Sequence, residues 1–220
     1  MITSLSAPAL CAYVTRQIGN FFPDGFAVDA RHLETAVDLA LERTEYCFSR
    51  INRPAYHTGT EAKFDHLFTD QYLVFLWFLS NSVWSLHANR ELATRVYYLN
   101  KALHAFDCMY DTGLPSVFFV AHGLGTVLGR AQYADYLHVS TGCVIGNNRG
   151  IYPRLGKFVG LGAGSAIIGD CTIGDHVSIG SGMRVFEKDI PERHSVFRSN
   201  EGQWVSKVTP GSFAEDFFRP

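Results

Sequence analysis

The first half of the chain carries apolar residues at the spacing of helices. Between Asp29 and Ile51, residues three or four positions apart are apolar, and Arg53-Pro54 ends the pattern. A second helix is expected from about Ala62 to His87, and a third from about Arg90 to Phe106. The third has one apolar stripe, formed by Leu92, Val96, Leu99, Leu103 and Phe106. A turn at Asp111–Pro115 closes this part. We therefore expect a helical domain over residues 1–112. Its many aromatic residues are expected to pack either in its own core or against neighbouring subunits.

The second half has a period of six instead. Aliphatic or aromatic residues recur at this spacing and resume after one interruption: Val127, Tyr133, Val139 and Ile145, then Leu155, Leu161, Ile167, Ile173, Ile179 and Val185. Glycine often follows them, and small side chains recur four positions on, at Cys143, Val159, Ser165, Cys171 and Val177. Helices and strands have periods of 3.6 and 2, so neither explains the spacing. A period of six is typical of a left-handed parallel β-helix, in which three units form one triangular coil. We expect this fold over residues 113–200, followed by a tail over residues 201–220.

One interruption breaks the repeat. Ile145 and Leu155 are ten residues apart instead of six, so about four residues are inserted around Asn147–Pro153. An insertion in a solenoid loops outward and leaves the stacked coils intact. This loop is therefore a candidate for lining a site, because a regular solenoid has few pockets of its own.

Composition agrees with two architectures and excludes several function classes. Of the 20 glycines, 14 fall between Gly123 and Gly182. A net charge of −2 offers no basic surface for nucleic acid or an anionic membrane. The five cysteines form no C-x-x-C pair, which argues against zinc and a disulfide framework. The apolar run Tyr72–Leu79 is too short to span a bilayer, and no signal peptide is indicated, so a cytoplasmic protein is expected.

The most informative chemical residue is His122. It stands in the string Ala121-His122-Gly123-Leu124-Gly125, where flanking glycines leave an imidazole accessible. A neutral imidazole can take a proton from a hydroxyl or amine that attacks a thioester. The glycines do not form a dinucleotide fingerprint, because they open no helix. His138 and His176 lie in the coils without a motif around them, and we expect structural roles for both.

These features together resemble the serine acetyltransferase family of hexapeptide acyltransferases. The resemblance covers roughly residues 90 to 200, and its most specific part is the string from Leu114-Pro115 through Phe118-Phe119 and His122 to Gly129-Arg130-Ala131. It implies that His122 is the general base. It also implies a supporting aspartate about fifteen residues upstream, at Asp107, with Asp111 as the alternative.

Two residues that contact serine in this family differ here. The family's Asp-His pair reads Ala121-His122, and its later Arg-His-Pro loop reads Ile151-Tyr152-Pro153. Ala121, Tyr152, Asp111 and Arg130 are expected at the acceptor site. The base is thus present, while the acceptor is left open between serine, another hydroxy amino acid and a sugar hydroxyl.

The resemblance also implies acetyl-CoA as co-substrate, without a metal. Small coil residues would let its pantetheine arm approach, and Lys188 would meet a phosphate; the small residues are Gly142, Gly162, Ala163, Gly164, Ser165 and Gly180. The assembly expected is a homotrimer or a dimer of trimers. The ending Phe217-Phe218-Arg219-Pro220 lacks the terminal isoleucine that docks cysteine synthase, so that partner is not expected. The alternatives are N-acylation of an amino sugar and a catalytically silent scaffold.

Overall fold

A computed structural model describes residues 1–219 of the chain. The chain folds as two compact units, which are described separately below. The first contains Met1–Ser49 and Pro54–Asp111, and the second contains Arg50–Arg53 together with the described residues from Thr112 on.

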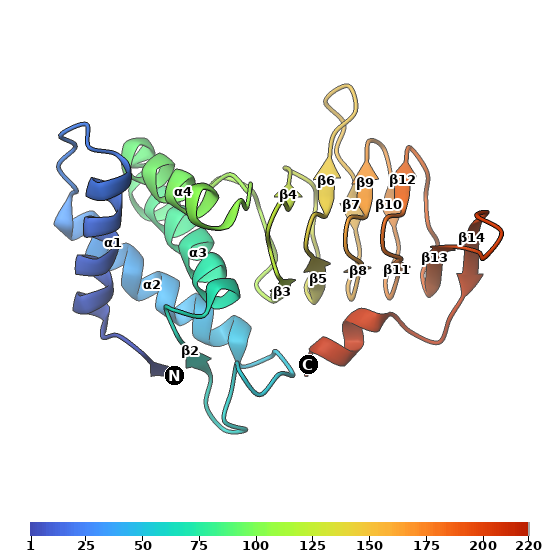
Figure 1. The fold of residues 1–220 in the computed structure, drawn as a ribbon, viewed down its shortest axis with the longest axis horizontal. Helices are drawn as coiled ribbons and strands as arrows, with labels where there is room; N and C mark the ends of the chain where they lie inside the picture. Colours follow the sequence, from blue (N-terminus) through green and yellow to red (C-terminus); the bar gives the residue numbers. More distant parts are fainter. Residues whose placement is uncertain (220) are drawn as a thin grey trace. The chain divides into compact units, whose positions relative to one another are not determined.

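The first unit is helical (Figure 1). It contains α1 (Ala7–Phe21), α2 (Ala30–Phe48), α3 (Thr69–His87) and α4 (Arg90–His104), with the short parallel strands β1 (Ile2–Thr3) and β2 (Lys63–Phe64). Side chains of Ser6, Asp29 and Asn89 accept hydrogen bonds from backbone N–H groups in the first turns of α1, α2 and α4. Helix α3 is buried over most of its circumference and forms the centre of this unit. None of the helices described is both long and apolar enough to cross a membrane.

The helix expected from about Ala62 begins only at Thr69, so its first two turns, about seven residues, were predicted wrongly. Residues Lys63–Phe64 instead form β2, which pairs with β1. The Asp65 carboxylate then accepts a hydrogen bond from the Leu67 backbone N–H, so a turn precedes α3. Helix α1 was not among the expected elements, although Ser6 and Pro8 are typical of a helix start.

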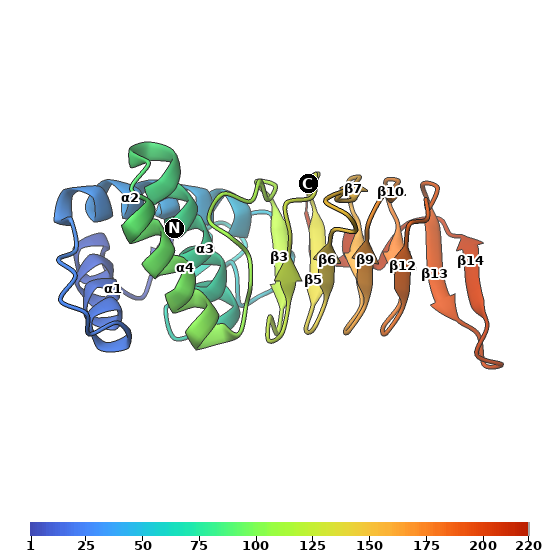
Figure 2. The ribbon, with the colours of Figure 1, turned by 90° about the horizontal axis from the view of Figure 1, so that it is seen from above.

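The second unit is a parallel β-helix, as predicted. Three faces of stacked strands form it, and Figure 2 shows the coils following one another from β3 to β13. The first face contains β3 (Phe118–Ala121), β5 (Leu137–Ser140), β8 (Gly160–Leu161), β11 (Ser178–Ile179) and β13 (His194–Arg198). The second contains β4 (Val127–Leu128), β6 (Val144–Gly146), β9 (Ala166–Ile168) and β12 (Arg184–Phe186). The third contains β7 (Arg154–Leu155) and β10 (Thr172–Ile173).

The strand register explains the period of six. Gly160 pairs with Ser178 and Ala166 pairs with Arg184, each 18 residues apart, so one coil contains three six-residue units. The aliphatic residues of the repeat fill the interior: Val139, Ile145, Leu161, Ile167, Ile179 and Val185 are at most 1% exposed. The small residues four positions beyond, such as Cys143 and Ser165, are equally buried.

The first coil departs from the expected phase. Val127 was expected inside, but it is 38% exposed, while Leu128 is 1% exposed and pairs with Ile145. Val120 and Leu128 are eight residues apart, whereas the residues that pair with them, Val139 and Ile145, are six apart. The turn between the first two faces is therefore two residues longer in this coil.

The interruption after Ile145 is the expected outward loop. His138 pairs with Gly160 at a separation of 22 residues, four more than in the later coils. Asn148 and Ile151 bridge across a tight turn, and Figure 1 shows this loop extending beyond the strand ends between β6 and β7. The Tyr152 ring lies against Gly129, where an added Cβ would approach its Cε1 atom to 2.7 Å. The loop thus folds back onto the first coil.

The end of the chain closes the β-helix. Strand β14 (Trp204–Val208) pairs antiparallel with β13, and the 3-10 helix η1 (Phe213–Phe217) then runs along the first face. Phe213 contacts Gly160, and Phe217 stacks on Phe119 at 5.2 Å. The tail expected over residues 201–220 is therefore folded against the coils as far as it is described.

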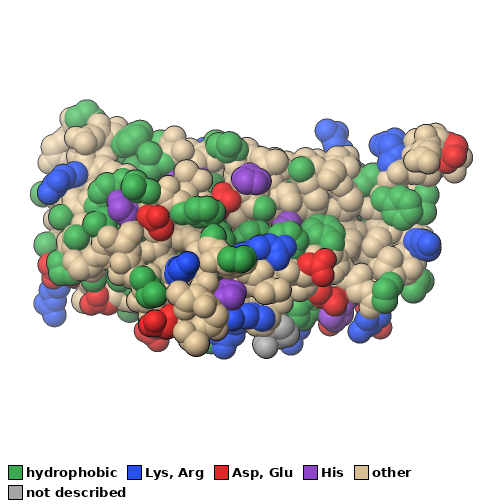
Figure 3. Space-filling view, turned by 60° about the horizontal axis from the view of Figure 1, so that its bottom comes forward, with side chains coloured by type: hydrophobic (Ala, Val, Ile, Leu, Met, Phe, Trp, Pro, Cys, Tyr) green, Lys and Arg blue, Asp and Glu red, His purple; other side chains and the backbone are tan. Residues whose placement is uncertain are grey.

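Basic and acidic side chains are interleaved on the face shown in Figure 3.

Candidate active site

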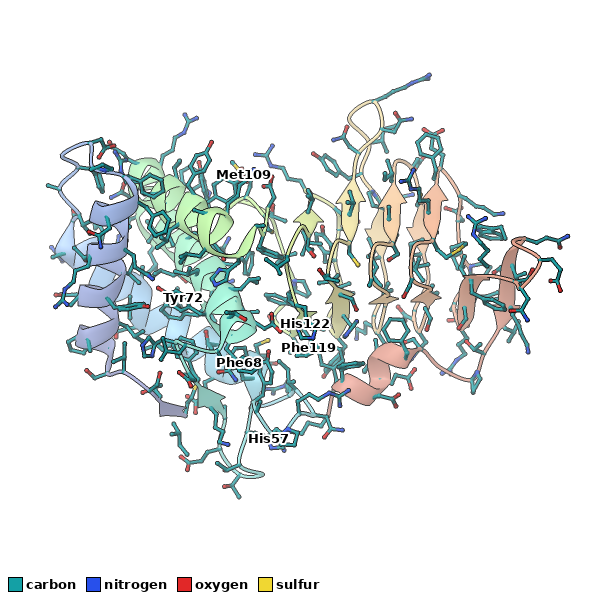
Figure 4. All side chains as sticks on the ribbon, viewed as in Figure 1. His57, Phe68, Tyr72, Met109, Phe119 and His122 are labelled. Carbon is teal, nitrogen blue, oxygen red and sulfur yellow. The ribbon has the colours of Figure 1, made fainter. Side chains whose placement is uncertain are left out.

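The lengthened turn of the first coil contains His122. Ala121 pairs with Ser140, and the Gly142 N–H donates to the Leu124 carbonyl, so His122-Gly123 is the segment without a counterpart in the next coil. His122 adopts a left-handed backbone with φ of 53°. Its side chain is exposed on the turn that follows β3, where Figure 4 labels it. The accessible imidazole expected from the flanking glycines is thus present, and a local insertion presents it.

The same corner carries a column of glycines. Gly125, Gly142, Gly164 and Gly182 follow one another from coil to coil, each with a φ between 68° and 72°. A Cβ added at Gly164 or Gly182 would meet no atom within 4 Å, so this part of the corner exposes bare backbone. Such a surface suits the close approach of an extended ligand chain.

Two other glycines expected at the cofactor have a packing explanation. A Cβ on Gly162 would lie 2.7 Å from the Ser181 N atom, and one on Gly180 would lie 3.0 Å from the Val196 carbonyl oxygen. Both glycines are therefore required by the stacking of the coils. Ala163 is exposed beside Gly164, whereas Ser165 is buried with its hydroxyl 3.7 Å from the Cys143 Sγ.

Asp107 lies in the helical unit and is firmly held there. Its two carboxylate oxygens accept hydrogen bonds from the Tyr97 hydroxyl and the Lys101 ammonium, both at 2.6 Å. Burial raises the pKa of Asp107, but the hydrogen bonds from Lys101 and Tyr97 outweigh burial and leave that pKa below its usual value. Asp107 is therefore ionised at neutral pH. Asp111 is exposed and ends the helical unit.

The remaining expected site residues are spread over the β-helix. Ala121 ends β3 next to His122, and Arg130 is exposed two residues after the end of β4. Tyr152 belongs to the inserted loop, which lies at a different corner of the coil from His122. The Lys188 ammonium lies 3.7 Å from the centre of the Trp204 ring, so it has an aromatic partner within its own chain.

Two threonines at the His122 turn were not among the residues expected from the sequence. The Thr126 hydroxyl donates to the Ser140 carbonyl at 3.2 Å, and the Thr141 hydroxyl donates to the Leu124 carbonyl at 2.9 Å. The signal available in the sequence was weak, because threonine is common at turns.

The other two coil histidines have structural surroundings, in agreement with expectation. His138 is 2% exposed among Phe119, Phe213 and Phe217. The His176 Nδ1 lies 2.6 Å from a Glu215 carboxylate oxygen, and its ring stacks on Phe158. The contacts of His138 with Phe213 and Phe217, and of His176 with Glu215, hold η1 against the β-helix.

The chain is similar in sequence to a curated serine acetyltransferase. It is 30% identical to the Synechococcus elongatus enzyme over 99 residues, which is 43% of this chain and 40% of the relative. The similarity thus spans about two fifths of the relative's length. No protein-family model matches the chain.

Solved structures of serine acetyltransferases share the fold. The Brucella abortus structure has a TM-score of 0.69 at 18% identity and covers 92% of this chain and 84% of its own. The Neisseria gonorrhoeae structure has a TM-score of 0.69 at 17% identity, with coverage of 96% and 83%. The soybean enzyme complexed with serine has a TM-score of 0.58 at 19% identity, with coverage of 91% and 78%. These likenesses confirm the predicted helical domain followed by a left-handed parallel β-helix.

Proposed function

We propose that the protein is an acetyl-CoA-dependent O-acetyltransferase in which His122 is the general base. The observation that carries this proposal is the His122 turn. It is two residues longer than the equivalent turn of the next coil, and its added segment carries an exposed imidazole. A solenoid gains nothing in packing from such an insertion. The sequence similarity to a serine acetyltransferase supports the same reaction class.

The chemistry requires one proton transfer and one acyl transfer. The acceptor hydroxyl attacks the thioester carbonyl while the neutral imidazole of His122 takes the hydroxyl proton. The tetrahedral intermediate then collapses, the carbon–sulfur bond breaks, and the leaving CoA thiolate takes the proton from the His122 imidazolium, which regenerates the neutral base. The family resemblance implies that the carboxylate stabilising the imidazolium is Asp107, with Asp111 as the alternative, and within the helical unit Asp107 is bound by Tyr97 and Lys101.

The corner beside His122 fits the co-substrate. Exposed backbone at Gly164 and Gly182, together with Ala163 and the partly exposed Gly142, gives an extended pantetheine arm a smooth path along successive coils. The Gly164 and Ser165 N–H groups already donate to the Thr141 and Gly162 carbonyls, so neither is assigned to the thioester carbonyl. Lys188 is the candidate for a phosphate, and binding there would compete with its contact to Trp204.

The acceptor is a small hydroxyl compound that does not need a carboxylate at position 121 or a histidine at position 152. Ala121 offers no charge to a substrate amine, and Tyr152 contributes a phenol in place of an imidazole. These two differences argue for a serine-like compound or a sugar as acceptor, with polar groups arranged differently from those of serine. An amino sugar is the alternative acceptor, in which case the transfer is to nitrogen.

A direct assay tests the activity. Release of free CoA thiol from acetyl-CoA is expected with at least one member of a panel containing serine, homoserine, sugar and amino-sugar acceptors. Product mass spectrometry separates O- from N-acetylation. If no acceptor gives turnover and calorimetry shows no acetyl-CoA binding, the protein is a scaffold and the proposal is wrong.

We also propose that the β-helix assembles as a homotrimer through its second face. Side chains on strands alternate inward and outward, so the residues between the buried ones face outward. On β4, β6, β9 and β12 the outward residues are mostly apolar: Val127 and Phe186 are exposed, Val144 and Ile168 are partly exposed, and Ala166 is buried among them. Exposed apolar rows on a solenoid face are typical of subunit interfaces.

Substitution of Phe186 tests this interface. Phe186 is 57% exposed in the single chain, so Phe186→Glu is expected to leave the fold intact and to split the assembly. Light scattering should give three or six times the 24.5 kDa chain mass for the wild type and a lower mass for the variant. Val208→Glu, at a 67% exposed residue of β14, is the matched control and should keep the wild-type mass. A wild type with the mass of one chain would rule out the trimer.

A further inference from the structure

The His122 turn is held by a hydroxyl group that the ordinary coil corner does not use. In three successive corners, a backbone N–H of one coil donates to a carbonyl of the coil before it. The pairs are Gly142 to Leu124 at 2.9 Å, Gly164 to Thr141 at 2.9 Å and Gly182 to Ala163 at 2.8 Å. These bonds stack the corners whether or not a hydroxyl side chain is present.

The first of these corners has an additional donor. The Thr141 hydroxyl donates to the Leu124 carbonyl at 2.9 Å, so this carbonyl accepts two hydrogen bonds from the second coil. At the equivalent position of the third coil stands Ala163, which has no hydroxyl, and its corner keeps the same backbone bond. The Thr141 bond is therefore not required for stacking.

The Thr126 bond differs in this respect. Its hydroxyl donates to the Ser140 carbonyl, and at the equivalent corner the Cys143 Sγ donates to the Gly162 carbonyl at 3.2 Å. A side chain at this position bonds to the next coil in both places, so Thr126 belongs to the ordinary corner. The hydrogen bond from Thr141 to the Leu124 carbonyl, in contrast, is found only at the corner where the turn is lengthened.

The lengthened turn has a reason to need such a bond. His122 holds a left-handed backbone that a non-glycine residue adopts only under local constraint, and Gly123 beside it adds freedom. The inserted segment His122-Gly123 is followed directly by Leu124, whose carbonyl accepts the hydrogen bond from Thr141. Fixing Leu124 fixes one end of the segment, while the pairing of Ala121 with Ser140 fixes the other.

From this geometry, and building on the proposed function, we propose that Thr141 is a positioning residue that holds the His122 imidazole in place for proton transfer. It acts through the Leu124 carbonyl and does not touch the substrate. Its side chain sits on the second coil, so it couples the reacting turn to the rigid solenoid. A general base loses rate steeply when its distance to the hydroxyl changes, up to about 10²-fold for about 1 Å.

Three variants test the assignment. Thr141→Val keeps the shape and removes the donor, Thr141→Ser restores the donor, and Ser181→Ala removes a hydroxyl at the equivalent position two coils further on. Two measurements are made on each full-length protein. Steady-state kinetics gives kcat and the KM of the acceptor, and hydrogen-exchange mass spectrometry follows a peptide spanning residues 119–128.

Thr141→Val is expected to lower kcat about tenfold with little change in the acceptor KM. It should also raise the exchange rate of the 119–128 peptide about fivefold, because removing a hydrogen bond allows local opening. Thr141→Ser should return both values toward wild type, and Ser181→Ala should change neither.

The assignment is wrong if Thr141→Val leaves the exchange of the peptide unchanged, if kcat is unchanged while exchange rises, or if serine fails to restore the wild-type values. Failure of the proposed function looks different. In that case the wild type shows no turnover with any acceptor, yet the exchange comparison still shows whether Thr141 holds the turn.

Discussion

Replacing His122 with asparagine is expected to lower kcat by about 10²- to 10⁴-fold, the usual contribution of a general base. Asparagine is chosen because it tolerates the left-handed backbone that His122 adopts, with φ of 53°, and so preserves the turn. The exposed position of the ring means that its loss leaves no cavity. Acetyl-CoA affinity measured by calorimetry should stay close to wild type, and thermal unfolding shows separately whether the variant remains folded under the assay conditions.

Chemical rescue with added imidazole distinguishes a catalytic role of His122 as general base from a purely structural role. His122→Gly also fits the left-handed backbone, and it leaves space at the position of the ring. Imidazole added to the assay should restore part of the lost turnover in His122→Gly and none in a His194→Gly control. His194 lies on β13 and outside the proposed site. Turnover near the wild-type level in His122→Asn would remove His122 from its proposed role.

The β-helix could be predicted from the sequence because its packing is local. In the later coils each inward residue pairs with a residue 18 positions away, as Ile167 does with Val185. The period of the solenoid is therefore visible in the sequence as a regular spacing of aliphatic residues. The phase of the first coil could not be predicted. Val127 and Leu128 are both aliphatic, and the choice between them depends on the two-residue insertion at His122-Gly123. The start of α3 was also predicted wrongly, because it depends on a contact between distant parts of the sequence. Lys63–Phe64 pairs with β1 and therefore forms a strand and not the first turn of the helix.

The candidate site could be predicted from the sequence only where the immediate neighbours of a residue mark it as unusual. His122 stood out because glycines flank it, and its exposure was confirmed. The sequence could not distinguish glycines required by coil packing from glycines that leave room for a ligand. Gly162 is required because a Cβ there would collide with Ser181, whereas Gly164 faces open space, and the two look alike in sequence. The bonds of Asp107 to Tyr97 and Lys101 depend on how the chain turns after α4, which no local pattern encodes.

A second large effect is expected on stability at acid pH, and it comes from His138. Its ring is packed between Phe119 and Phe217, and neither ring nitrogen makes a hydrogen bond within the described residues. Burial, with a smaller contribution from the Arg53 charge, lowers the pKa of His138 to about 4. The ring is therefore neutral in the folded protein, where it serves as an aromatic support for η1.

The sign of the pH dependence follows from this lowered pKa. Between pH 6.5 and pH 4 the unfolded chain binds a proton at His138 that the folded chain does not, so the free energy of unfolding falls as the pH falls. The loss at this one residue should be about 2 kcal/mol at pH 5 and about 3 kcal/mol at pH 4. His104, in the helical unit, has its pKa lowered to about 4 chiefly by burial and should add a comparable loss there.

His138→Phe isolates the contribution, because phenylalanine keeps the aromatic packing and cannot be protonated. Urea unfolding at pH 7 and at pH 5, at one protein concentration, is expected to show a smaller difference in the variant than in the wild type, by about 2 kcal/mol. His104→Phe should reduce the acid sensitivity independently, since the two histidines lie in different units. If His138→Phe loses as much stability on acidification as the wild type, the ring is protonated or hydrated in the folded state. The C-terminal segment would then be held by the His176–Glu215 pair and by Phe213, without help from a desolvated imidazole.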